Sequence, residues 1–159
     1  MDVVSSYHIP ANLIPNLELF RRVLIAFLLG ALIGWERERH SRGGQLSAGI
    51  RTYAAISLGA CVFGILSVSL PGGGADPSRI AAQIVSGVGF LGGGVIFRQP
   101  HGVSGLTTAA TLWATAAIGL AVALGFYLVS ILTSLLIYLM LYLPRLAWWR
   151  SLTGTKIAD

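Results

Sequence analysis

Polar and charged residues that could bind an ion or a ligand recur at helical spacing inside an otherwise apolar stretch of the chain. At positions i, i+3, i+7 and i+10 stand Asp76, Arg79, Gln83 and Ser86. This spacing predicts a polar stripe on one face of a helix. Asp76 followed by Pro77 is typical of a helix start, with Asp as N-cap and Pro in the first turn. Gln83 lies deeper, and because a buried amide must find hydrogen-bond partners, we expect it to face the interior of a helix bundle.

A second polar stripe consists of threonines. Thr107, Thr111 and Thr115 repeat every four residues, and Thr108 stands beside the first. Threonine in a membrane helix commonly bonds its own i−4 carbonyl, so the stripe alone is compatible with a purely structural role. The alternative is that Thr107, Thr108 and Thr111 belong to a functional polar site.

Charge is concentrated directly after the first apolar segment. The six charged residues there are Glu36, Arg37, Glu38, Arg39, Arg42 and Arg51. Glu36 follows Trp35 and is expected at the membrane interface, where an unpaired carboxylate is costly. Arg39, Arg51 and Arg98 are candidate partners for it. Lipid anchoring and helix capping are the simpler interpretation of this segment, and an ion or partner site is the alternative.

Glycines at four-residue spacing predict close helix packing. The residues assigned this role are Gly30, Gly34, Gly87, Gly89, Gly92, Gly93 and Gly94. Residues 87–92 also match the G-x-G-x-x-G pattern of dinucleotide sites, but no strand precedes them and no acid follows at the required distance. We therefore interpret them as packing residues. The three consecutive glycines weaken a helix, and the alternative is that this backbone lines a site.

No pattern typical of an enzyme is present. There is no H-E-x-x-H, Ser-His-Asp or paired-carboxylate arrangement, and the three histidines have no partners at metal-ligand spacing. The single cysteine, Cys61, excludes a disulfide framework within the chain. We expect no catalytic residue, no metal site and no cofactor.

The elements that must position these residues are membrane spans. Of 159 residues, 55% are hydrophobic and 11% charged, and the mean hydropathy is +0.76; soluble domains carry about 25% charged residues. A span takes about 20 residues. We therefore predict an all-α polytopic membrane protein with an N-terminal tail at 1–16, a transmembrane domain at 17–143 and a cytoplasmic tail at 144–159. The five spans are expected at about 17–35, 52–70, 79–97, 106–123 and 126–143, with a loop at 98–102.

The basic residues predict the orientation. With the N-terminus outside, eight lie inside (Arg37, Arg39, Arg42, Arg51, Arg98, Arg145, Arg150 and Lys156) and three outside (Arg21, Arg22 and Arg79). This bias favours N-out, C-in. The net charge of +5 is then explained by topology and the lipid bilayer. We expect no nucleic-acid partner, since no basic patch alternates with aromatic residues.

Four blocks of sequence resemble the MgtC/SapB family of bacterial inner-membrane proteins. They are residues 36–39, 48–52, 76–96 and 105–113, and the resemblance covers about 17–123. It implies a five-span helical domain, in agreement with the span count. Many relatives also carry a C-terminal soluble domain, and this chain is expected to be a short form without it.

The resemblance also implies a role in magnesium homeostasis and in adaptation to low Mg²⁺ and acid stress. In intracellular pathogens, relatives support survival inside macrophages, and some act through the F-type ATP synthase. We therefore expect a non-enzymatic, virulence-related homo-oligomer, packed through its glycine faces, that binds another membrane complex. One alternative is a small-ion or small-solute transporter or channel, with Gln83, Thr107 and Thr111 along a path between the third and fourth spans. A structural scaffold is the third possibility.

Overall fold

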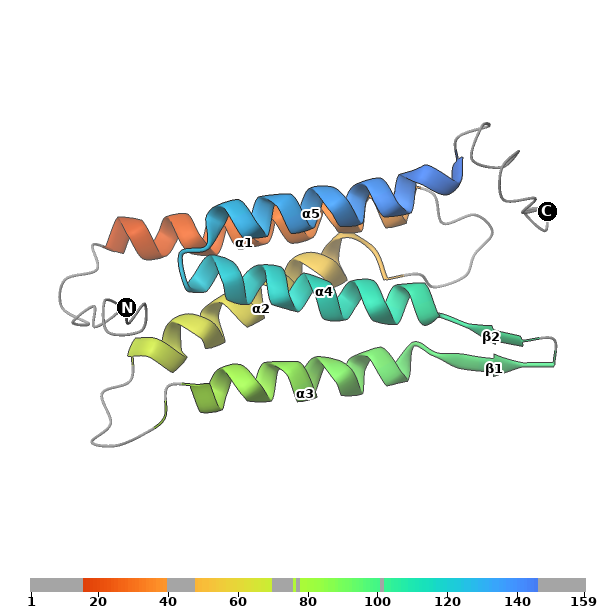
Figure 1. Ribbon diagram of the computed structural model, residues 1–159, viewed down its shortest axis with the longest axis horizontal. Helices are drawn as coiled ribbons and strands as arrows, with labels where there is room; N and C mark the ends of the chain where they lie inside the picture. Colours follow the sequence, from red (N-terminus) through yellow and green to blue (C-terminus); the bar gives the residue numbers. More distant parts are fainter. Residues whose placement is uncertain (1–15, 40–47, 70–75, 77, 101, 146–159) are drawn as a thin grey trace, which may run out of the picture.

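Five helices and one β-hairpin make up the described part of a computed structural model, which covers residues 16–39, 48–69, 76, 78–100 and 102–145 (Figure 1). The helices are α1 (Asn16–Arg39), α2 (Ile50–Ser69), α3 (Ser78–Gly94), α4 (Leu106–Ala123) and α5 (Tyr127–Tyr142). The strands are β1 (Phe97–Gln99) and β2 (Gly102–Ser104), and a 3-10 turn, Leu143–Arg145, follows α5. The chain is mostly helical, as the sequence predicts.

The helices differ in how well they meet the requirements of a membrane span. Among the described residues, α2 and α4 are long and apolar enough to cross a membrane, with mean hydropathies of 1.7 and 1.6. The apolar helix α5 is shorter, at 16 residues. The 24-residue helix α1 carries charged side chains at both ends, and α3 has 17 residues, which is a length of about 25 Å.

The segment between α3 and α4 departs from the all-α prediction. The third predicted span extends to residue 97, but α3 ends at Gly94, and the predicted loop at 98–102 is part of an antiparallel hairpin that pairs Phe97 with Ser104. The run of glycines ends the helix early because glycine stabilises it poorly. Gly105 then starts α4 with a φ of 88°, and a side chain there would collide with the carbonyl of Val95.

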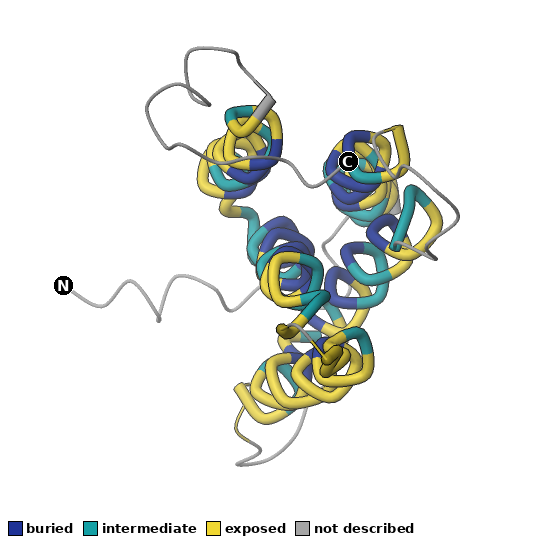
Figure 2. Tube along the Cα trace, turned by 90° about the vertical axis from the view of Figure 1, so that its right-hand side faces the viewer, coloured by how far each residue is buried: buried dark blue, intermediate teal, exposed yellow. Residues whose placement is uncertain are grey.

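Helix α4 is the centre of the bundle and contacts the other four helices. Its residues Leu112 and Ile118 join Ile33 of α1 and Tyr53 of α2 in the main core cluster. Among the described helices, α3 packs mainly on α2 and α4. Seen end-on, it is the lowest coil, and its outer side is largely exposed (Figure 2).

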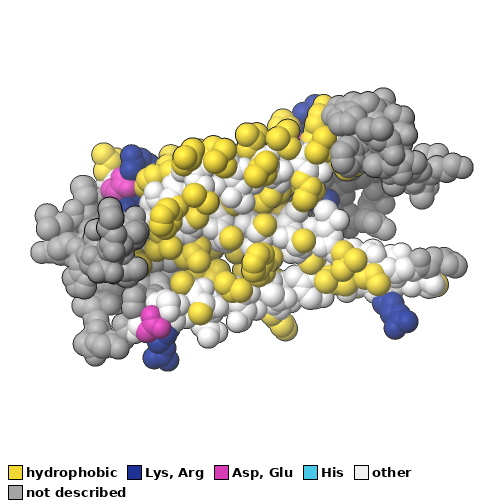
Figure 3. Space-filling view, viewed as in Figure 1, with side chains coloured by type: hydrophobic (Ala, Val, Ile, Leu, Met, Phe, Trp, Pro, Cys, Tyr) yellow, Lys and Arg dark blue, Asp and Glu magenta, His cyan; other side chains and the backbone are white. Residues whose placement is uncertain are grey.

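The surface of the described part is divided along the bundle axis. Charged side chains gather at the two ends, and hydrophobic side chains cover the length between them (Figure 3). The most exposed large apolar residues include Phe90 at 83% and Leu128 at 71%. A soluble domain does not leave such a continuous apolar band open to water. The apolar band and the two helices that are long and apolar enough to cross a membrane are those of a membrane protein.

Candidate functional site

A buried polar cluster lies where α1, α2 and α4 meet. The half-buried Arg37 and Thr108 and the buried Tyr53 and Thr111 make the contacts there, and Glu36 is buried on α1 directly before Arg37. The Glu36 side chain is 1% exposed, and Tyr53 and Thr111 are also fully enclosed. Arg37 Nη2 donates to Thr108 Oγ1 at 2.5 Å, and the hydroxyls of Tyr53 and Thr111 lie 2.5 Å apart. Both contacts join α4 to a neighbouring helix.

The threonine hydroxyls also bond within their own helix. Thr111 Oγ1 donates to the Thr107 carbonyl at 2.9 Å, and Thr115 Oγ1 donates to the Thr111 carbonyl at 2.7 Å. Since the Thr111 proton is directed to a carbonyl, Tyr53 is the donor in the contact between the two hydroxyls. Thr107 itself is exposed, and its backbone carbonyl accepts the bond from Thr111.

The polar stripe of α3 lies elsewhere. Arg79, Gln83 and Ser86 are exposed, so Gln83 does not face the bundle interior of a single chain as expected. The Asp76 carboxylate accepts hydrogen bonds from the Ser78 backbone N–H and hydroxyl, each at 2.8 Å. These two bonds stabilise the ionised form and hold the pKa of Asp76 below its usual value. Asp76 therefore caps the start of α3, and the structure does not bring it near Glu36.

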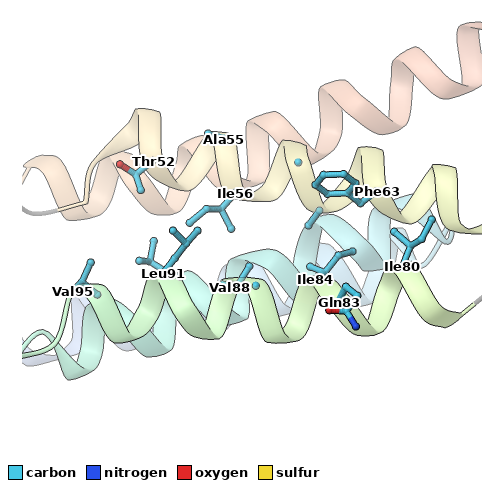
Figure 4. A pocket seen from close by; sticks show the side chains of 14 residues that line it. Thr52, Ala55, Ile56, Phe63, Ile80, Gln83, Ile84, Val88, Leu91 and Val95 are labelled. Carbon is cyan, nitrogen blue, oxygen red and sulfur yellow. The ribbon is translucent and has the colours of Figure 1, made fainter.

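A largely apolar groove of about 710 Å³ separates α2 from α3 (Figure 4). Phe63 and Ile56 line it from α2, and Ile84 and Leu91 from α3. Gln83 borders the groove, while Thr107 and Thr111 are not among its lining residues. A second, much smaller cavity of about 70 Å³ lies against α3 and α4, with only apolar side chains around it.

The three arginines proposed as partners of Glu36, namely Arg39, Arg51 and Arg98, are at the surface. Arg39 places its guanidinium 5.2 Å from the centre of the Trp35 ring, and Arg51 is exposed in the first turn of α2. Glu38, at the end of α1, accepts a hydrogen bond from the Ile50 backbone N–H at 2.9 Å. It thereby caps α2, whose start carries no capping side chain of its own.

The seven predicted packing glycines fall into two groups. A side chain at Gly30 or Gly34 would collide with the backbone of α2, and Gly92 packs on Ala109 of α4. Side chains at the other four, Gly87, Gly89, Gly93 and Gly94, would meet no atom within 4 Å. In a single chain these four glycines lie open.

Sequence reasoning missed a charged cluster at the opposite end of the bundle. Glu18 forms salt bridges with Arg21 at 2.6 Å and Arg22 at 3.1 Å, and it accepts a hydrogen bond from the Tyr127 hydroxyl at 2.6 Å. Arg22 Nη1 also donates to the Ala123 carbonyl at 2.5 Å, at the C-terminal end of α4. The i,i+3 and i,i+4 spacing of Glu18 from the two arginines could have indicated the salt bridges. Nothing in the sequence indicated the contact with Tyr127.

Chemically, these arrangements bind helices to one another. Within the described ranges, no three His, Cys, Asp or Glu side chains lie close enough to hold a metal ion. Together, the helical bundle, its apolar outer band and its internal hydrogen bonds define a small helical membrane protein.

Comparison with known proteins gives the family. The model of the MgtC family matches residues 23–147, most of the chain, and the protein belongs to this family. Protein MgtC of Brucella abortus (strain 2308) is 51% identical over 100 residues, 63% of this chain and 40% of that protein. Protein MgtC of Salmonella typhimurium (strain LT2) is 55% identical over 103 residues, 65% of this chain and 42% of that protein. The aligned part thus spans about two fifths of these relatives. No solved structure matches the chain.

Proposed function

We propose that this is a multi-pass inner-membrane protein of magnesium homeostasis, serving adaptation to low Mg²⁺ and acid stress. It acts without enzymatic chemistry, by binding another membrane complex, of which an F-type ATP synthase is the first to test. Membership of the MgtC family supports the physiological role.

We infer this binding mode from the residues that line the groove between α2 and α3. Of the residues that line it, Thr52 and Gln83 carry the polar side chains, and the others are apolar or glycine. An ion path needs polar groups to replace the ion's water. An apolar groove at a membrane-facing surface instead suits the side chains of another helix.

The role is tested by deleting the gene in the native host and restoring it on a plasmid. We expect the deletion strain to grow poorly in low Mg²⁺ and at acid pH, and the intact chain to restore growth. A Gly59→Leu variant, which places a side chain into the open groove, should fold but fail to restore it. Normal growth of the deletion strain under both conditions would contradict the stress role.

Flux measurements distinguish binding from transport. Purified protein in proteoliposomes should move neither Mg²⁺ nor other small ions above the rate of empty vesicles. Robust flux that Gln83→Leu abolishes would overturn the binding mode and favour a channel or transporter.

A further inference from the structure

The outward face of α3 carries a side-chain amide, that of Gln83, which lipid cannot satisfy. The helix packs inward through Ile84, Val88 and Gly92, which are buried. Its other side exposes Gln83, Ser86 and the open backbone of the glycines. The same side also exposes Val85, Phe90 and Leu91, so the outward face of α3 is mixed, with an amide and a hydroxyl among apolar side chains.

Helix α5 shows the opposite pattern and serves as the reference for a lipid-facing surface. Its serines, Ser130 and Ser134, are buried. Its exposed side is mainly aliphatic, with Leu132 at 49% and Leu136 at 65% exposure. Hydrocarbon cannot satisfy an amide, so a polar side chain at membrane depth normally faces protein. By this comparison, α3 and not α5 has a face that protein must cover.

We propose that a second copy of this chain covers that face, with the two α3 helices parallel and related by a twofold axis along the membrane normal. Such an axis brings like residues of the two copies to the same depth. The Gln83 amide is both donor and acceptor, so it pairs with its own counterpart.

Opposite charges at one end of α3 also match between the two copies. Asp76 and Arg79 are both exposed, carry opposite charges and lie within one turn at the same end of α3. In the parallel dimer each arginine lies beside the partner's Asp76.

The spacing i, i+4, i+7 and i+11 is that of a helix–helix seam, and on α3 it is occupied by Gln83, Gly87, Phe90 and Gly94. The glycines, with no atom within 4 Å of an added Cβ, let the backbones approach closely. Gln83 and Gly87 also lie at the edge of the groove between α2 and α3, so the two surfaces adjoin, but the dimer does not depend on the magnesium role.

Disulfide crosslinking of the full chain in nanodiscs of phosphatidylethanolamine and phosphatidylglycerol tests the interface. The background is Cys61→Ala, which removes the buried native thiol. We expect Gln83→Cys and Phe90→Cys to form crosslinked dimers on mild oxidation, and Leu136→Cys on α5 to form few. Equal crosslinking at all three positions, or crosslinking confined to α5, would overturn the proposal.

The strength of association gives a second, independent readout. We expect Gln83→Leu to lower the dimer association constant about 3- to 18-fold, which corresponds to the roughly 0.6 to 1.7 kcal/mol measured for hydrogen bonds between membrane helices. Gln83→Asn should retain more of the association. Fluorescence energy transfer between labelled copies measures both, and circular dichroism checks that each variant is helical. A wild-type chain that stays monomeric, with lipid alone on α3, would exclude the interface.

Discussion

Hydrogen bonds of single hydroxyl and guanidinium groups link the helices of this bundle. Tyr53 and Thr111 join α2 to α4, and Arg37 and Thr108 join α1 to α4. Each contact lies between helices that are distant in sequence. The self-bonding of Thr111 could be predicted from its spacing alone. The contact with Tyr53 could not, because nothing in the sequence indicates which helix lies opposite.

Removal of the Tyr53 hydroxyl tests this contact. We expect Tyr53→Phe to lower the free energy of unfolding by about 1 kcal/mol, a typical value for one hydrogen bond. The loss stays small because Thr111 keeps its bond to the Thr107 carbonyl. Denaturation in detergent micelles measures it. Tyr142→Phe, at an exposed position of α5, is the control, and an equal loss in both variants would contradict the assigned role.

At the scale of elements, glycines decide how closely the helices approach. Gly119 of α4 lies against the Ser57 backbone of α2, and Gly64 of α2 lies against Ala123 of α4. Sequence reasoning selected neither, because a glycine in an apolar helix has the same signature whether or not it faces a neighbour. It did select Gly30 and Gly34, which lie against α2.

A pair of alanine substitutions separates packed from open glycines. Gly119→Ala would place a methyl group inside van der Waals contact of the Ser57 carbonyl, and we expect a loss of about 1–3 kcal/mol through overpacking. Gly59→Ala meets no atom within 4 Å and should be neutral or gain up to about 1 kcal/mol from helix propensity. Thermal unfolding in detergent compares the two. Similar stabilities would show that α2 and α4 are not closely packed at Gly119.

At the scale of the whole molecule, the charged residues that the structure describes lie at the ends of an apolar body. The Glu18 cluster occupies one end, and Arg37, Glu38 and the hairpin with Arg98 occupy the other. This separation is what a bilayer imposes on a chain that crosses it.

Reporter fusions test the predicted orientation. Green fluorescent protein after residue 159 should fluoresce, and alkaline phosphatase inserted in the hairpin between β1 and β2 should be inactive, because both sites are expected in the cytoplasm. Phosphatase inserted between α2 and α3 should be active. The opposite pattern would reverse the orientation that the eight inner and three outer basic residues predict.

The sequence alone determined the protein class, the approximate position of each helix and the family resemblance, because hydropathy and local motifs depend only on neighbours along the chain. Even the early end of α3 has a local cause in its run of glycines. Only the tertiary structure decided which face of each helix is covered. It enclosed Glu36 and Tyr53 and left Gln83 outside, since burial depends on the helix that lies opposite. That partner is chosen by packing across the whole bundle and not by spacing within one segment.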